Sequence, residues 1–362
     1  MDKRFYLLDL LRGLAALSVV IWHYRHFYYV DGIFPDNAYL SEFPLNTLLK
    51  IPYEYGGLAV EFFFCLSGFI FFQFYYSKIS LGKISFRAFF VRRLLRLYPI
   101  FLFSLLLTIL LNYYHEIYFG SFFVYEFNDL KHFIYNLLLI HQWGFQEGWS
   151  FNGPSWSISV EWLLYLVFFA VCLLRVNIFI SSLIMIIAGF ILFPFNPNVG
   201  RGMILFFFSA FIWLLSNYEG LSNRIKSILV LLYLLICLFS VTLIPTILLN
   251  LYPSLFNFLE DKSLFELFFI IGIVPATVYF ASSVVIKNNF FNKFCDLFGQ
   301  LSYPIYLFHF PVQIFLINFE IINEPSLMSS LFVYLFAVFA ISYLFNKYLD
   351  IPLRNELTKR FL

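Results

Sequence analysis

The sequence predicts an all-α protein, a polytopic bundle of about ten transmembrane helices with both termini in the cytoplasm. Three observations lead to this fold class. Of the 362 residues, 62% are hydrophobic and only 12% are charged, and the mean hydropathy of +0.84 is far above that of soluble globular domains. Apolar runs of spanning length recur along the chain. When these runs are threaded through a membrane, most Lys and Arg residues fall on one side.

The apolar runs predict the spans in order. Each is long enough, or nearly long enough, to cross the hydrocarbon core: 6 to 28, 57 to 76, 97 to 113, 156 to 174, 178 to 194, 202 to 216, 228 to 249, 265 to 286, 302 to 320 and 328 to 346. The stretch 133 to 141 is too short to cross, and we interpret it as re-entrant or interfacial. With the N-terminus inside, 17 of the 23 Lys and Arg residues are cytoplasmic, as the positive-inside rule requires.

The connections between the spans contain no internal repeat and no low-complexity linker, so we predict one integral-membrane domain over residues 1–362. The first span is too long for a signal peptide and lacks a small-residue cleavage site, so we expect it to stay attached. The longest outer loop, residues 30–55, contains Pro35, Pro44 and Pro52. We expect this loop to be irregular and to cover the outer mouth of the bundle.

Charge and cysteine content exclude several kinds of partner. The net charge is only +2 and no basic strip fits a nucleic-acid groove, so we do not expect nucleic acid as a partner. The four cysteines have no paired spacing, which argues against a disulfide framework and against a cysteine metal site. Membrane lipid is the expected surrounding partner, and the sequence indicates no oligomeric state.

A basic residue and a histidine share one face of the first span. His23 follows Arg12 by eleven residues. Eleven steps of about 100° return a helix to within roughly 20° of its start, about 16 Å further along the axis. Asp9 joins the same stripe, three residues before Arg12. Because an ionisable group at membrane depth costs on the order of 3 kcal/mol, we expect the stripe to face the protein interior and to be functional.

Two carboxylates stand near the predicted outer ends of other spans, Glu61 in the second and Glu161 in the fourth. On this topology His23 lies in the outer half of the membrane as well. We therefore predict a proton-handling group of Glu61, Glu161 and His23, since a carboxylate partner fixes the tautomer of a histidine and raises its basicity. The alternative is a buried ion network that only holds helices together.

Three arginines, Arg92, Arg93 and Arg96, precede Tyr98 and Pro99 at the inner end of the third span. Arg93 and Arg96 are three residues apart on a helix and project to neighbouring positions, which suits forked contacts with phosphate groups. The alternative is that these arginines only set the topology, because cytoplasmic arginines at a membrane boundary are what the positive-inside rule requires.

The remaining histidines divide into two kinds. His309 ends the segment that begins at Ser302 and Tyr303, where Pro304 leaves a helix turn free to meet a ligand. The others lie in loops or at interfaces, where we expect solvated roles: His26, His115, His132 and His141. His23 and His26 are one turn apart, but no third ligand at useful spacing follows, so we expect no metal.

Taken together, these motifs resemble the acyltransferase-3 family of integral-membrane acyltransferases. The first span resembles the opening motif of the family, a basic residue with ten residues between it and a histidine. Further segments resemble family segments in the expected order, and the resemblance runs from residue 6 to 354: Glu61 to Phe69, Arg93 to Pro99, Trp156 to Glu161, Ser302 to His309 and Asp350 to Arg354. No single motif is decisive, but the ordered set is specific.

The resemblance implies transfer of an acyl group, commonly acetyl, from cytoplasmic acyl-CoA to a sugar hydroxyl on the far side of a bacterial inner membrane. It implies that His23 is the catalytic histidine, that Arg12 is its motif partner and that Arg93 and Arg96 bind the donor. We expect Asp9, Glu61 and Glu161 to complete the catalytic set, and the remaining donor contacts to come from Arg92, Ser302, Tyr303 and His309.

A surface polysaccharide such as the O-antigen of lipopolysaccharide is the expected acceptor. Some family branches carry an appended extracytoplasmic hydrolase-like domain, which we do not expect here because the chain stops at Leu362. An acyl-histidine intermediate is the competing route. The alternative functions are a proton-coupled glycan or lipid transporter or flippase, which buried ionisable residues would also suit, and a structural subunit of a glycan-assembly complex.

Overall fold

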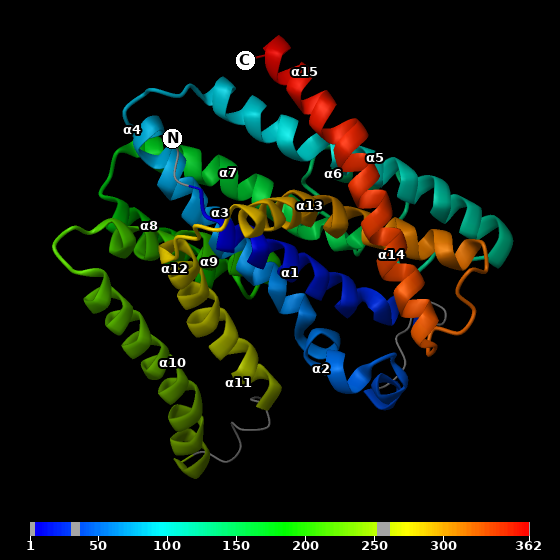
Figure 1. The fold of residues 1–362 in the computed structure, drawn as a ribbon, viewed down its shortest axis with the longest axis horizontal. Coiled ribbons are helices and arrows are strands. Elements are labelled where there is room, and N and C mark those ends of the chain that lie inside the picture. Colours follow the sequence, from blue (N-terminus) through cyan, green and yellow to red (C-terminus); the bar gives the residue numbers. More distant parts are fainter. Residues whose placement is uncertain (1–3, 30–36, 252–260, 362) are drawn as a thin grey trace. The chain divides into compact units, whose positions relative to one another are not determined.

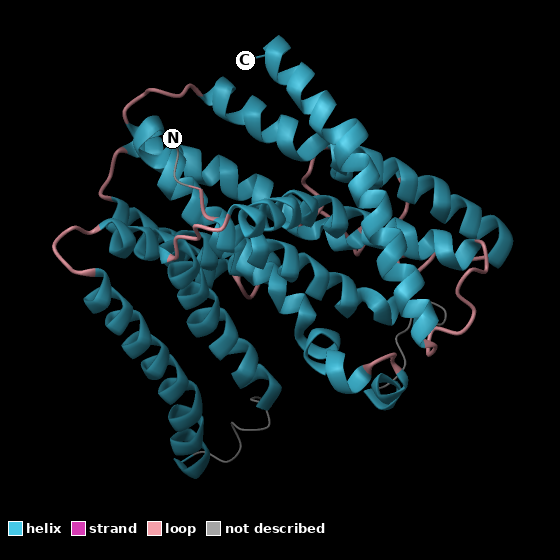
Figure 2. Ribbon diagram, viewed as in Figure 1, coloured by secondary structure: helices cyan, strands magenta, loops and turns pink. Residues whose placement is uncertain are grey.

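A computed structural model describes residues 4–29, 37–251 and 261–361. Within these residues every regular element is a helix and there is no strand (Figure 2). Eight helical segments are long and apolar enough to cross a membrane: Tyr6–Tyr28, Asn46–Ser80, Phe86–Phe119, Gly153–Leu174, Pro197–Asn217, Asn223–Thr242, Leu264–Ser283 and Met328–Phe361. The all-α polytopic fold class is therefore confirmed.

Two of the ten predicted spans are absent from these eight segments of the described chain. The run at 178 to 194 forms the shorter apolar helix α8 (Ile178–Leu192). The run at 302 to 320 lies almost wholly in α13 (Asn289–Asn318), whose polar side chains lower its hydropathy. The number of spans and the side on which each terminus lies stay predictions.

The chain forms two compact units, and each is described by itself. The first unit contains residues 1–10, 58–81 and 170–295, and the second contains residues 11–57, 82–169 and 296–362. The helices α1 (Tyr6–Trp22), α7 (Trp156–Leu174) and α13 pass from one unit to the other along the chain. The single domain that we expect stays a prediction.

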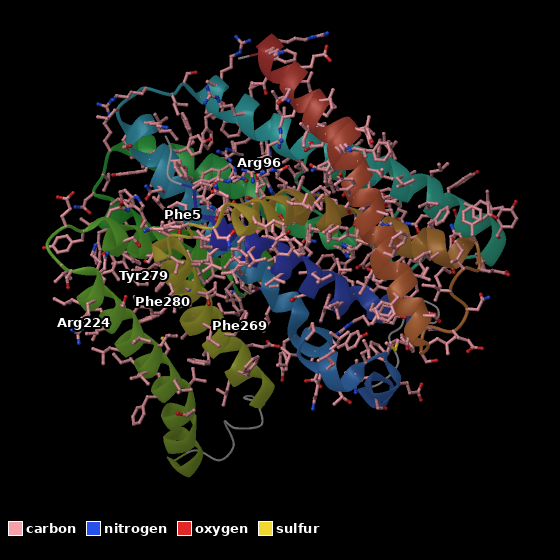
Figure 3. The ribbon with its side chains drawn as sticks, viewed as in Figure 1. Phe5, Arg96, Arg224, Phe269, Tyr279 and Phe280 are labelled. Atoms are coloured by element: carbon pink, nitrogen blue, oxygen red, sulfur yellow. The ribbon has the colours of Figure 1, made fainter. Side chains whose placement is uncertain are left out.

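In the first unit, α3 (Ala59–Phe71) and α8 both pack against α9 (Pro197–Asn217). The backbones of α3 and α9 approach closely at Gly68, where an added Cβ would lie 2.2 Å from the main-chain oxygen of Phe206. Beside them, α10 (Asn223–Leu251) neighbours α11 (Asp261–Phe268). A π-helical turn over Phe269–Ile273 joins α11 to α12 (Val274–Ser283), so that the three elements form one rod (Figure 1). Phe269 lies at this turn (Figure 3).

The second unit is organised around α5 (Phe86–Phe119) and α13. Ser85 caps the start of α5 by accepting a hydrogen bond from the Ala88 N–H at 3.2 Å. Gly120 ends the helix with a φ of +81°, a conformation that glycine adopts without strain. The other helices of this unit are α2 (Asn46–Tyr55), α6 (Leu130–Leu137), α14 (Met328–Phe345) and α15 (Ile351–Phe361), with a π-helical turn over Asn346–Asp350 between the last two.

The expectation of an irregular loop over residues 30–55 is wrong for its described part. Residues 30–36 lie outside the described residues, but a 3₁₀ helix covers Asn37–Glu42 and α2 follows, with Pro52 inside it. The reason is tertiary packing. The Tyr53 ring is buried against Phe43, and its hydroxyl donates to the main-chain oxygen of Pro44 at 2.9 Å. This contact holds a helix that the prolines alone would disfavour.

The stretch 133 to 141 begins in α6, which has eight residues and is too short to cross a membrane, as expected. Its last residue, Leu137, accepts a hydrogen bond from the Tyr98 hydroxyl at 3.0 Å. This contact ties α6 to the part of α5 that follows Arg96.

Candidate active site

Helix α13 connects the predicted site residues of the second unit, because successive turns of it meet them in order. Arg12 Nη2 donates to the Gly299 main-chain oxygen at 2.6 Å. The Tyr303 hydroxyl donates to the Leu97 main-chain oxygen at 2.9 Å. His309 lies beside His23, with 4.7 Å between the ring centroids. Arg12 and His23 therefore face the same partner helix, as predicted, and α1 and α13 run parallel side by side (Figure 1).

His23 stands where the first helix changes its geometry. The α-helix ends at Trp22, and His23 begins a 3₁₀ helix that continues to Tyr28, so the single α-helix assumed for this span is wrong at its end. His23 Nδ1 lies 2.9 Å from the Val19 main-chain oxygen. Because that oxygen can only accept, Nδ1 carries the proton and Nε2 keeps the lone pair that a general base needs.

His26 is fixed by a glutamine on α13. Gln313 Nε2 donates to the His23 main-chain oxygen at 2.7 Å, which turns its Oε1 toward His26 Nδ1 at 3.1 Å. His26 Nδ1 must therefore donate. On the other side of the ring, Nε2 lies 3.5 Å from the Tyr125 hydroxyl, which acts as the donor. Gln313 is fully buried, and it was missed because a single glutamine in an apolar run does not reveal its partner.

His309 is completely buried, with Nδ1 2.6 Å from the Tyr306 main-chain oxygen. As in His23, the carbonyl requires the proton on Nδ1 and leaves the lone pair on Nε2. This Nε2 atom is buried and has no hydrogen-bond partner. We call His23, His26 and His309 the histidine cluster. All three carry the proton on Nδ1, and the His23 ring contacts the rings of the other two.

The solvated roles expected for four histidines are wrong, since His26, His115, His132 and His141 are all at least nine-tenths buried. All four have side-chain partners, which buried imidazoles need. For example, His132 Nδ1 lies 2.9 Å from Asp129, and these hydrogen bonds lower the pKa of the Asp129 carboxyl. Burial lowers the pKa of His141 to about 4. Among the residues described, no group of three or more His, Cys, Asp or Glu side chains is arranged to hold a metal ion.

A second cluster surrounds Tyr165 on α7. Its hydroxyl donates to Glu161, and Arg93 lies over its ring at 5.8 Å. Arg93 and Arg96 both interact electrostatically with Tyr165. Arg93 is 5% exposed, whereas its neighbours Arg92 and Arg96 are exposed. We call Arg93, Arg96, Glu161 and Tyr165 the arginine–tyrosine cluster; Arg96 is labelled in Figure 3.

Tyr303 joins this cluster to α13. It interacts electrostatically with Glu161, Tyr165, Arg96 and with Asp350 in the π-helical turn after α14. Asp350 is also 3.8 Å from Arg354. Sequence reasoning missed Tyr165, although its position one turn after Glu161 was a usable signal, because tyrosines are so frequent in this chain.

The three members of the predicted proton-handling group have different partners in the structure. Glu161 belongs to the arginine–tyrosine cluster, beside Arg93 and Arg96. Glu61 lies in the first unit, 1% exposed, and forms an ion pair with Arg201 at 2.9 Å. This pairing favours the alternative for Glu61, a buried ion network that holds α3 to α9.

The remaining predicted residues have structural partners. Asp9 forms an ion pair with Arg4 at 3.5 Å. The Ser302 hydroxyl donates at 2.8 Å to the Gly299 oxygen that also accepts from Arg12. The start of the Ser302 to His309 segment therefore holds α13 to α1.

Fold and site together define a multi-pass, all-helical membrane protein with buried imidazoles and a buried guanidinium. The family described as an acyltransferase domain matches residues 5–347. The chain therefore belongs to the acyltransferase-3 family.

One curated relative is "Protein 2 in picA locus" of Rhizobium radiobacter, to which the chain is 35% identical over 105 residues. The aligned part is 29% of this chain and 44% of the relative, so the chain spans less than half the length of that protein. No solved structure matches the chain.

Proposed function

We propose that the protein is a membrane O-acyltransferase that moves an acyl group, in the simplest case acetyl, from cytoplasmic acyl-CoA to a sugar hydroxyl. The acceptor is a surface or lipid-linked glycan such as O-antigen lipopolysaccharide, and the location is a bacterial inner membrane. The observation that carries the proposal is the His23 tautomer. The Val19 carbonyl holds the proton on Nδ1, and Nε2 is left as a base inside a chain of this family.

The donor end of the reaction is assigned to the arginine–tyrosine cluster. Arg93 and Arg96 are three residues apart on α5 and both act at Tyr165, so they suit the phosphate groups of CoA. Tyr303 and His309 are six residues apart on α13, which is about 9 Å along the axis. The extended pantetheine arm then carries the thioester along α13 from the arginines to the histidine cluster.

In the transfer step, His23 Nε2 takes the proton from the acceptor hydroxyl. The hydroxyl oxygen attacks the thioester carbonyl, the new C–O bond forms and the C–S bond breaks. CoA leaves as a thiolate and takes up the proton from His23, which returns to its neutral state. Arg12 is bonded to Gly299, about 15 Å along α13 from His309, so its task is to hold α1 against α13 rather than to touch the reacting atoms.

A proton-coupled glycan or lipid transporter is the second candidate, because three adjacent buried imidazoles also suit a proton relay. The deciding experiment uses the purified protein in vesicles with labelled acetyl-CoA and candidate glycans. Label in the glycan supports the acyltransferase. Proton-coupled movement of glycan without label supports the transporter and overturns the proposal.

A further inference from the structure

His309, a member of the histidine cluster, has an unused hydrogen-bonding atom. Its Nε2 atom is buried without a partner, and its side chain is 0% exposed. Leaving a buried acceptor unsatisfied costs about 1–3 kcal/mol, so such an atom in a native fold calls for an explanation, such as a role in binding. Because Nδ1 donates to Tyr306, Nε2 is an acceptor only, and its missing partner must be a hydrogen-bond donor.

His23 and His309 keep their lone pair on the same ring atom, and their rings are in contact. Each Nδ1 is bound to a main-chain oxygen about one turn earlier in its own helix, Val19 for His23 and Tyr306 for His309. In both rings the unprotonated nitrogen is therefore Nε2. Because the ring centroids are 4.7 Å apart, one site contains two acceptor atoms.

His26 does not offer a third such atom. Gln313 occupies its Nδ1 and the Tyr125 hydroxyl lies at its Nε2. The site therefore presents a pair of acceptors, one of which is the base of the proposed reaction.

A sugar carries a matching pair of donors, two hydroxyls on adjacent carbons. We infer that His309 Nε2 accepts a hydrogen bond from the hydroxyl next to the one that is acylated, so that the enzyme selects acceptors with a vicinal diol. The inference rests on the proposed function. The reacting hydroxyl gives its proton to His23, while the neighbouring hydroxyl stays intact and only donates to His309. His309 is then a specificity residue for the acceptor, and not the donor-binding residue predicted from the sequence.

The test compares two soluble acceptors that differ only in that neighbouring hydroxyl, a glycoside with a vicinal diol and its deoxy analogue. The full chain in vesicles should use the diol with a kcat/KM about tenfold to a hundredfold higher, the range expected when a buried acceptor loses its partner. In His309→Phe, which keeps an aromatic ring but has no lone pair, this ratio should fall to near one.

The matched control is His115→Phe, the same change at another buried histidine, whose partner is Asn318. It should keep the diol preference, because a ratio of two acceptors does not depend on the fraction of active protein. Equal use of both acceptors by the parent chain, or an unchanged preference in His309→Phe, would overturn the inference and leave the proposed function standing. If His309→Phe does not insert into the membrane, the inference is tested by whether the parent chain prefers the diol to its deoxy analogue. Absence of label in every acceptor would instead count against the proposed function itself.

Discussion

Gln313 joins α13 to the end of the first helix by donating to the main-chain oxygen of His23 at 2.7 Å. The bond is made where α1 changes into a 3₁₀ helix. The same amide accepts from His26, so one side chain fixes the positions of two histidines.

The first prediction follows from this contact. Gln313→Leu leaves the His26 Nδ1–H buried without its partner, at a cost of about 1–3 kcal/mol, and removes a hydrogen bond from the His23 carbonyl. We expect a lower melting temperature in detergent and slower acyl transfer with unchanged acyl-CoA affinity. The control is Gln300→Leu, the same change at an exposed position of α13, which should leave both properties unaltered. Parent-like stability in Gln313→Leu would show that the bond is dispensable.

The second prediction concerns the base. His23→Ala should lower the rate of acyl transfer by roughly 100-fold to 10,000-fold, the range for a positioned general base, while the protein still inserts and binds acyl-CoA. Transfer of label from acetyl-CoA to glycan measures the rate, and acyl-CoA binding measures the integrity of the fold. Parent activity in an inserted variant would remove His23 from the mechanism.

Much of this arrangement could be predicted from the sequence. The spacing of Arg12 and His23 indicates a shared face, and both residues do meet α13. The identity of the partner helix could not be predicted, because a single sequence contains no information about contacts between distant segments. Glu161 shows the consequence: topology predicted a group with His23, whereas in the structure Glu161 accepts a hydrogen bond from Tyr165, and Arg93 lies over the Tyr165 ring.

The burial of the loop histidines could not be predicted for a related reason. A histidine in a loop looks solvated in sequence, but the segment between α6 and α7 folds back onto the bundle. Its Ser150 accepts from the Asn136 amide, and its Asn152 donates to the main-chain oxygen of Leu307. These long-range bonds carry His141 into the interior, beside Phe101.

The third prediction concerns the donor. The double variant Arg93→Ala with Arg96→Ala should weaken acyl-CoA binding by more than about a hundredfold, since each charge-assisted contact to phosphate is worth about 1.5–3 kcal/mol. Isothermal titration with acyl-CoA measures the change, and acceptor affinity should stay nearly the same. Arg87→Ala, at an exposed position of the same helix, is the control. An unaltered donor dissociation constant in the double variant would mean that the arginines only set the topology.

The fourth prediction uses His141, which lies outside the membrane-spanning segments. Burial lowers its pKa to about 4 in the folded state, against about 6.5 in the unfolded chain. Between these values only the unfolded chain binds the proton, so the stabilising effect is complete above pH 6.5 and is lost as the pH falls toward 4. The full shift corresponds to roughly 3 kcal/mol.

Thermal unfolding in detergent at pH 7.5 and pH 5 measures this effect in the parent chain and in His141→Gln. The other histidines are common to both proteins, so their titration cancels in the difference. The parent should lose more stability than His141→Gln on acidification. An equal loss would mean that His141 is protonated in the folded protein.

The last prediction concerns Arg12, which lies about 16 Å along the first helix from His23 and cannot reach the same reacting atom. Its Nη2 atom donates to the Gly299 oxygen, a bond that a lysine ammonium can also make. Arg12→Lys should therefore keep much of the transfer activity that Arg12→Ala loses, because charge and one donor are retained without the planar fork. Acetyl transfer and acyl-CoA affinity, measured on both variants in vesicles, separate the possibilities. Failed rescue by lysine would point to bidentate geometry, and full activity in Arg12→Ala would mean that the arginine has no part in the reaction.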